Sequence, residues 1–149
     1  MKPEYRAIRL RQLTRTLEAF DSARTQPRPP RGWMRAIREA LGLTLDQVGR
    51  WLKVSRQQIA KYETAEADDR ITLATLRRVA EAMGCELVYA IVPKSGSFAD
   101  LNEKQAREQA TKRVLAAEHT MALENQAAGN VEQAIADETQ RILKQRRKQ

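Results

Sequence analysis

Residues 45–63 read LDQVGRWLKVSRQQIAKYE, and this stretch decides the fold. It places a small residue, Gly49, between Val48 and Leu52, which lie one helical turn apart. Two short helices that cross steeply at a tight turn need a residue without bulk where they touch, and Gly49 meets that need. The pattern therefore predicts two helices joined by a turn. The residues expected to fill the angle between them are Val48, Leu52, Val54, Ile59 and Tyr62.

The second of these helices has a polar outer face without acidic residues. That face carries Arg56, Gln57, Gln58 and Lys61. Arginine can bond guanine with two hydrogen bonds, glutamine can bond adenine in the same way, and Ser55 at the helix start can hold a phosphate. A solvated helix face is the plain alternative, but the packing pattern puts this face where the groove of double-stranded DNA would lie. We therefore predict a helix-turn-helix that binds DNA through these five residues and Thr44.

Further helices are expected on both sides of this motif. Trp33, Ile37 and Leu41 mark one helix, which Gly42 would end. Thr44, Ser55 and Thr72 are predicted to cap the three helices that follow. The last of these would end at Gly84, completing a small helical core from about residue 32 to residue 84.

The N-terminal third of the chain carries most of the net positive charge. Residues 1–44 hold 10 basic and 4 acidic side chains, whereas the whole chain has a net charge of +8. Residues 4–20 have the spacing of an amphipathic helix, and the three prolines of residues 27–31 predict an extended linker. Arg28 and Arg31 flank these prolines. They are predicted either to enter an adjacent minor groove or to keep the linker soluble.

Residues 85–92, CELVYAIV, are rich in β-branched and aromatic residues and are followed by Pro93, so they predict a strand. A single strand leaves its backbone donors and acceptors unpaired. The rest of the sequence offers no candidate partner strand, so pairing with the same strand of a second copy is expected. The sequence therefore predicts a homodimer.

Two helices are expected in the C-terminal part of the chain. The first has a narrow stripe of mostly small residues, which would let another element approach closely: Ala106, Ala110, Val114, Ala117 and Met121. This stripe is predicted to cover the paired strands or to pack against its own mate. Gly129 and Asn130 separate it from a second helix that ends in a basic cluster.

Several function classes are excluded at this point. A single cysteine, Cys85, and a single histidine, His119, provide neither a disulfide nor a Cys/His metal cluster within one chain. Glu118 and His119 are helix neighbours that point apart and have no accompanying nucleophile. We therefore predict no metal, no cofactor and no enzymatic activity. The charged N-terminus lacks a signal peptide or membrane span, so a cytoplasmic location is expected.

Residues 42–63, GLTLDQVGRWLKVSRQQIAKYE, resemble the repressor-like helix-turn-helix family, which includes phage repressors and antitoxin-type regulators. The wider family usually has Gln where this chain has Leu45 and Gly where it has Lys53. The resemblance to the family called mobile mystery protein A covers nearly the whole chain. The stretches that carry it are LRQLTRTLEAF (10–20), PRPPRGWMRAIREALGLT (27–44), ITLATLRRVAEAMGCELVYAIVP (71–93) and EHTMALENQA (118–127).

The expected architecture is mainly α. It comprises an N-terminal helix and linker (1–31), a helix-turn-helix domain (32–84), a dimer-forming strand (85–93) and C-terminal helices (98–149). The expected function is sequence-specific binding to an inverted-repeat DNA site as a homodimeric repressor of its own operon. Because members of the resembled family are typically encoded beside a Fic-domain protein, the resemblance implies an alternative: an antitoxin-like protein that binds and neutralises such an enzyme.

Overall fold

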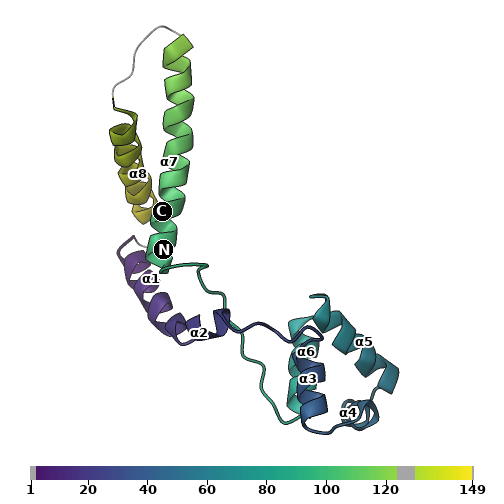
Figure 1. The fold of residues 1–149 in the computed structure, drawn as a ribbon. Helices are drawn as coiled ribbons and strands as arrows, with labels where there is room; N and C mark the ends of the chain where they lie inside the picture. Colours follow the sequence, from purple (N-terminus) through teal and green to yellow (C-terminus); the bar gives the residue numbers. More distant parts are fainter. Residues whose placement is uncertain (1–2, 124–129, 149) are drawn as a thin grey trace. The chain divides into compact units, whose positions relative to one another are not determined.

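The structure is a computed structural model that describes residues 3–123 and 130–148 (Figure 1). Within these ranges the chain forms eight α-helices and no strand, so the prediction of a mainly α protein is confirmed. The helices are α1 (Pro3–Glu18), α2 (Asp21–Arg24), α3 (Trp33–Ala40), α4 (Leu45–Leu52), α5 (Arg56–Ala67), α6 (Leu73–Ala82), α7 (Phe98–Leu123) and α8 (Val131–Lys148). They belong to two compact units, residues 22–90 and residues 1–21 with 91–149, which are described separately.

The unit of residues 22–90 is built around one apolar core between α3, α4, α5 and α6. Its buried members are Met34, Val48, Ile59, Val79 and Met83. Leu52, Val54 and Tyr62 pack around this centre, so all five residues expected between the two crossing helices take part in it. The turn between α4 and α5 is short in Figure 1.

Three hydroxyl side chains begin the helices of this unit, as the sequence predicts. Thr44, Ser55 and Thr72 each accept a hydrogen bond from the backbone amide three residues later. Thr44 also forms a reciprocal capping box, because Gln47 Oε1 accepts a hydrogen bond from the Thr44 amide at 2.8 Å. These bonds fix where α4, α5 and α6 start.

Both acidic residues of α5 point into this unit. Glu63 is 6 % exposed and forms two hydrogen bonds with Arg38, from Nε at 2.5 Å and from Nη2 at 3.2 Å. The hydrogen bonds with Glu63 hold the pKa of Arg38 above its ordinary value, against the opposing effect of burial. Glu66 is 3 % exposed and accepts hydrogen bonds from the amides of Trp33 and Met34, both at 2.8 Å. Its carboxylate therefore satisfies two amides at the start of α3, where negative charge is favourable.

The second unit contains α1, α7 and α8. The last two form a helical hairpin whose buried side chains are Ala106, Ala110, Ile135 and Ile142, with Val114 packed against them (Figure 1). An ion pair between Arg113 and Glu138, at 2.8 Å, also joins the two helices. Ser97 and Asp100 cap α7 reciprocally: Asp100 Oδ2 accepts hydrogen bonds from the amide and the hydroxyl of Ser97, and the Asp100 amide donates to that hydroxyl. The bond from the Ser97 amide and, to a smaller extent, the bond from its hydroxyl lower the pKa of Asp100. Helix α1 packs against both α7 and α8, a contact that the sequence analysis did not predict.

Two expectations need correction. Residues 85–93 form neither a strand nor a helix, because no segment in the described part of the chain lies beside them as a ladder partner. The stripe of small residues is covered by α8 of the same chain, since Ala106 and Ala110 let that helix approach closely. Ala117 is exposed, and the side chain of Met121 lies outside the described residues.

Candidate nucleic-acid interface

The turn between α4 and α5 depends on the backbone at two positions, Lys53 and Gly49. Lys53 ends α4 in the left-handed conformation, with φ 58° and ψ 42°, as expected for a residue that stands where the wider family has glycine. The amide of Val54 then donates to the carbonyl of Gly49 at 2.9 Å, which closes the turn. Gly49 is buried, and a Cβ atom on it would lie 2.7 Å from the carbonyl oxygen of Val54. The contact predicted for Gly49 is therefore confirmed.

The exposed face of α5 has basic and neutral polar side chains only. Its exposed residues are Arg56, Gln57, Lys61 and Thr64. Because Glu63 and Glu66 point inward, no carboxylate of α5 reaches this face. A surface of this composition can meet phosphates and base edges without repulsion.

The other predicted DNA contacts near α5 differ in their exposure and in the hydrogen bonds they already make. Ser55 and Thr44 are exposed, and each hydroxyl oxygen accepts a helix-capping hydrogen bond. The Thr44 hydroxyl also donates to Gln47 Oε1 at 3.1 Å, whereas the structure gives the Ser55 hydroxyl no acceptor within the described residues. Gln58 is half-buried, because it lies beside Ile59 on the flank of α5 that faces the core. Arg56, Gln57 and Lys61 are thus the most accessible of the predicted contacts.

Arg28 lies at the opposite end of α5. Its guanidinium donates to the carbonyls of Glu66 and Ala67, at 3.1 and 3.0 Å, and pairs with Asp69 at 2.6 Å. A helix of 12 residues is about 18 Å long at 1.5 Å per residue, so this guanidinium lies far from the first turn of α5. Its bonds stabilise the C-terminal end of α5, where positive charge is favourable.

Arg31, the other arginine of the proline-rich linker, is exposed. It lines a hollow along α5 together with Ala60, Thr64 and Ala67. It therefore lies beside the middle and C-terminal part of α5, and no hydrogen bond within the described residues occupies its guanidinium.

Two residues at the start of α4 influence this surface. Leu45, which stands where the wider family has glutamine, packs against the core instead of facing outward. Asp46 Oδ2 lies 3.8 Å from Arg56 Nη1, and both side chains are 59 % exposed. Asp46 was not among the predicted contacts, because only the packing of α4 on α5 brings it beside Arg56. At this exposure the pair contributes little stability, but it restrains the guanidinium at the first turn of α5.

Other kinds of site find no support in the described ranges. No group of three or more histidine, cysteine or acidic side chains is arranged to hold a metal ion among these residues. None of the helices described is both long and apolar enough to span a bilayer.

Comparison with known protein families identifies a domain in this chain. The family model described as helix-turn-helix matches residues 34–89, which run from the second residue of α3 to the segment after α6. The search of curated proteins found no match, and the search of solved structures found none either. A domain of this kind indicates DNA binding and is typical of regulators of transcription that are not enzymes. Residues 34–89 are therefore a helix-turn-helix domain of the XRE type.

Proposed function

We propose that the protein is a sequence-specific repressor that inserts the first turns of α5 into the major groove of double-stranded DNA. The observation that carries this proposal is the exposed face of α5, where Arg56, Gln57 and Lys61 stand clear of every carboxylate of the helix. The N-terminal residues of a recognition helix are the ones that contact base edges in this motif. Ser55, at the start of α5, is proposed to donate to a phosphate, and Thr44, at the start of α4, to do the same by exchanging its hydrogen bond to Gln47 for one to the phosphate.

Replacing Arg56 or Gln57 by alanine is expected to weaken binding to the specific DNA site by about 1–3 kcal/mol, because base contacts are lost. Binding to random DNA should change less. The measurement is fluorescence anisotropy on a site found by footprinting the DNA upstream of the protein's own gene. Arg78→Ala, which removes the same charge from the exposed face of α6, is the control. Equal losses on specific and random DNA for Arg56→Ala and Gln57→Ala would contradict base reading.

We also propose that the protein acts as a homodimer paired through residues 85–92. Three apolar side chains in this segment are exposed: Val88 at 65 %, Tyr89 at 59 % and Ile91 at 81 %. A segment outside the helices that exposes apolar side chains and has no ladder partner within the described residues favours antiparallel pairing with a second copy. The two α5 helices would then face the same side of the duplex. The expected operator is an inverted repeat with half-sites about 34 Å apart, or a multiple of this distance.

Light scattering is expected to give a dimeric mass for the wild type and a monomeric mass for Val88→Pro with Ala90→Pro, which removes two backbone donors. The double variant should also lose its preference for an inverted repeat over a single half-site. Ser95→Pro introduces proline just outside the segment and should leave the dimer intact. A monomeric wild type, or a double variant that still dimerises, would refute strand pairing.

A second candidate function follows from the resemblance to the mobile mystery protein A family, namely the binding and neutralisation of a neighbouring Fic-type enzyme. Exposed apolar side chains on α1 favour a protein partner: Tyr5 is 57 % exposed and Ile8 is 49 % exposed. The two functions separate cleanly, because Arg56→Ala and Gln57→Ala should abolish repression while leaving neutralisation unchanged. Either function would place the protein in the cytoplasm.

A further inference from the structure

A cavity of about 460 Å³ lies between α1, the start of α7 and the end of α8, within one compact unit. Its wall is mostly apolar and includes Ala7, Leu10 and Leu143. The cavity is well within the size range of small-molecule sites, which combine apolar walls with a few convergent polar groups. It shares no residue with the proposed DNA-binding surface.

Five arginines line this cavity: Arg6, Arg11, Arg15, Arg146 and Arg147. The lining includes two carboxylates, Glu18 and Glu103, so five positive and two negative groups leave a net charge of +3. No ion pair joins any of the five arginines to a carboxylate in the described ranges. Like charges that line one cavity repel one another, and an anion bound among them would reduce this repulsion.

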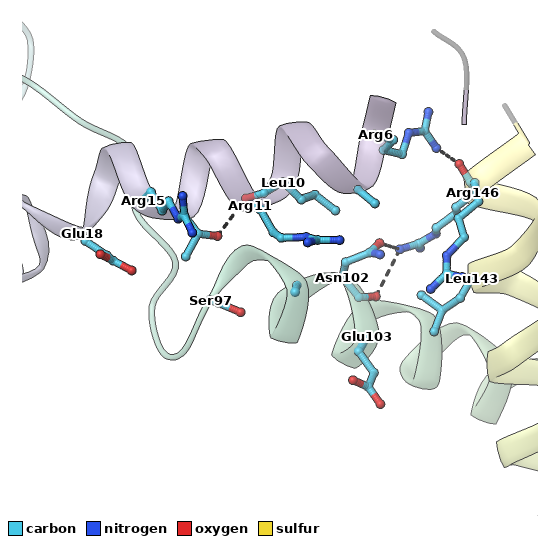
Figure 2. Close-up of a pocket in the computed structure, with 14 residues that line it drawn as sticks. Arg6, Leu10, Arg11, Arg15, Glu18, Ser97, Asn102, Glu103, Leu143 and Arg146 are labelled. Atoms are coloured by element: carbon cyan, nitrogen blue, oxygen red, sulfur yellow. Dashed lines mark hydrogen bonds between the residues drawn. The ribbon is translucent and has the colours of Figure 1, made fainter. Parts of the chain in front are cut away.

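The existing hydrogen bonds orient some of these groups without neutralising them. Arg146 donates to Asn102 Oδ1 at 2.8 Å and to Gln109 Oε1 at 3.4 Å, which are neutral acceptors. Arg6 donates to the backbone carbonyl of Arg146, which is also neutral. In Figure 2 the side chain of Arg11 runs between α1 and α7 and points toward Asn102, the residue that holds Arg146. Arg11 has no hydrogen-bond partner in the described part of the chain.

We propose that this cavity binds a small organic polyphosphate, with its phosphates between Arg11 and Arg146 and its apolar body against Ala7, Leu10 and Leu143. Guanidinium forks match phosphate oxygens with two parallel hydrogen bonds, and a multiply charged anion suits the net charge of +3 better than a monoanion does. The apolar wall favours a ligand that carries a ring or hydrocarbon portion over inorganic phosphate. The inference goes beyond DNA binding and does not depend on it.

The test is calorimetric titration of the full-length protein with ATP in magnesium-free buffer at low salt. Saturable binding of one ATP per chain is expected, with pyrophosphate and adenosine each binding at least tenfold more weakly. Arg11→Gln and Arg146→Gln should each weaken ATP binding by about tenfold or more, since each removes a charged donor. Arg9→Gln removes the same charge from an exposed position of α1 that does not line the cavity, so it should change affinity by less than about twofold.

Three results would overturn the proposal: no saturable ATP binding, an equal loss for Arg9→Gln and Arg11→Gln, or full displacement of ATP by random duplex DNA. The last would make the DNA backbone the occupant. Arg11 is exposed and has no structural partner, so Arg11→Gln keeps the test valid if Arg146→Gln fails to fold. Footprinting without ATP tests the DNA-binding function separately.

Discussion

Replacing Gly49 by leucine is expected to unfold the helix-turn-helix domain and abolish its binding to DNA. A Cβ atom at this position would lie 2.7 Å from the carbonyl oxygen of Val54, and that oxygen is backbone, so it cannot move without shifting the turn. The rest of a leucine side chain would have to enter a contact that is already buried. Overpacking in a close-packed core usually costs about 1–3 kcal/mol, and here the separation of α4 from α5 adds to that cost.

Circular dichroism melting and DNA binding together measure this effect. Gly49→Ala should be destabilised less than Gly49→Leu, because it adds only the Cβ atom. Arg50→Leu puts the same side chain at the next position of α4, which is exposed, and should melt close to the wild type. A Gly49→Leu protein that folds and binds DNA normally would show that α4 and α5 do not touch at Gly49.

Glu63→Ala is the second substitution with a large expected effect, a loss of about 3–5 kcal/mol in the free energy of unfolding. The side chain of Arg38 is only 11 % exposed, so removing Glu63 takes away the buried carboxylate that holds its guanidinium and leaves only the longer, half-exposed contact with Glu39 at 3.7 Å. Arg38 would keep its hydrogen bond to the Leu43 carbonyl, at 3.0 Å, but that acceptor carries no charge. Deprotonation cannot relieve the penalty near neutral pH, because the pKa of arginine is far too high.

Denaturant titration of three variants tests this prediction. Arg38→Met combined with Glu63→Leu should be markedly more stable than Glu63→Ala, because it removes both charges and restores apolar packing. Arg70→Ala breaks an exposed pair with Asp68 in the same unit and should cost no more than about 0.5 kcal/mol. If Glu63→Ala and Arg70→Ala had equal effects, the Arg38–Glu63 pair would contribute no more than a surface pair.

The local features of the helix-turn-helix could be predicted from the sequence because each depends on a few neighbouring residues. Thr44 and Ser55 carry hydroxyls that satisfy free amides at helix starts, and Gly49 is small where two helices cross. The burial of Glu63 and Glu66 was missed, since charged helix residues usually face water. A signal was present: with Ile59 they occupy positions i, i+4 and i+7, the spacing of a buried face.

Features that depend on distant residues could not be predicted in the same way. Residues 85–93 have the composition of a strand, but composition does not provide the partner that a ladder requires. The packing of α1 on α7 and α8 joins segments at least 80 residues apart, from Glu18 to Phe98, and nothing in the repeat of leucines in α1 specifies these partners. For the same reason the five arginines around the cavity appeared in the sequence as two unrelated basic segments.

The hydrogen bonds between the proline-rich linker and α5 determine the N-terminal boundary of the folded DNA-binding domain. Gly32 adopts φ 85° directly against the carboxylate of Glu66, and Arg28 is bonded to the far end of the same helix. A fragment cut at Met34, where the family match starts, would lose the Trp33 amide bond to Glu66 along with the Arg28 bonds. The smallest fragment that retains all these bonds starts at Arg28, so four residues of apparent linker belong to the folded domain.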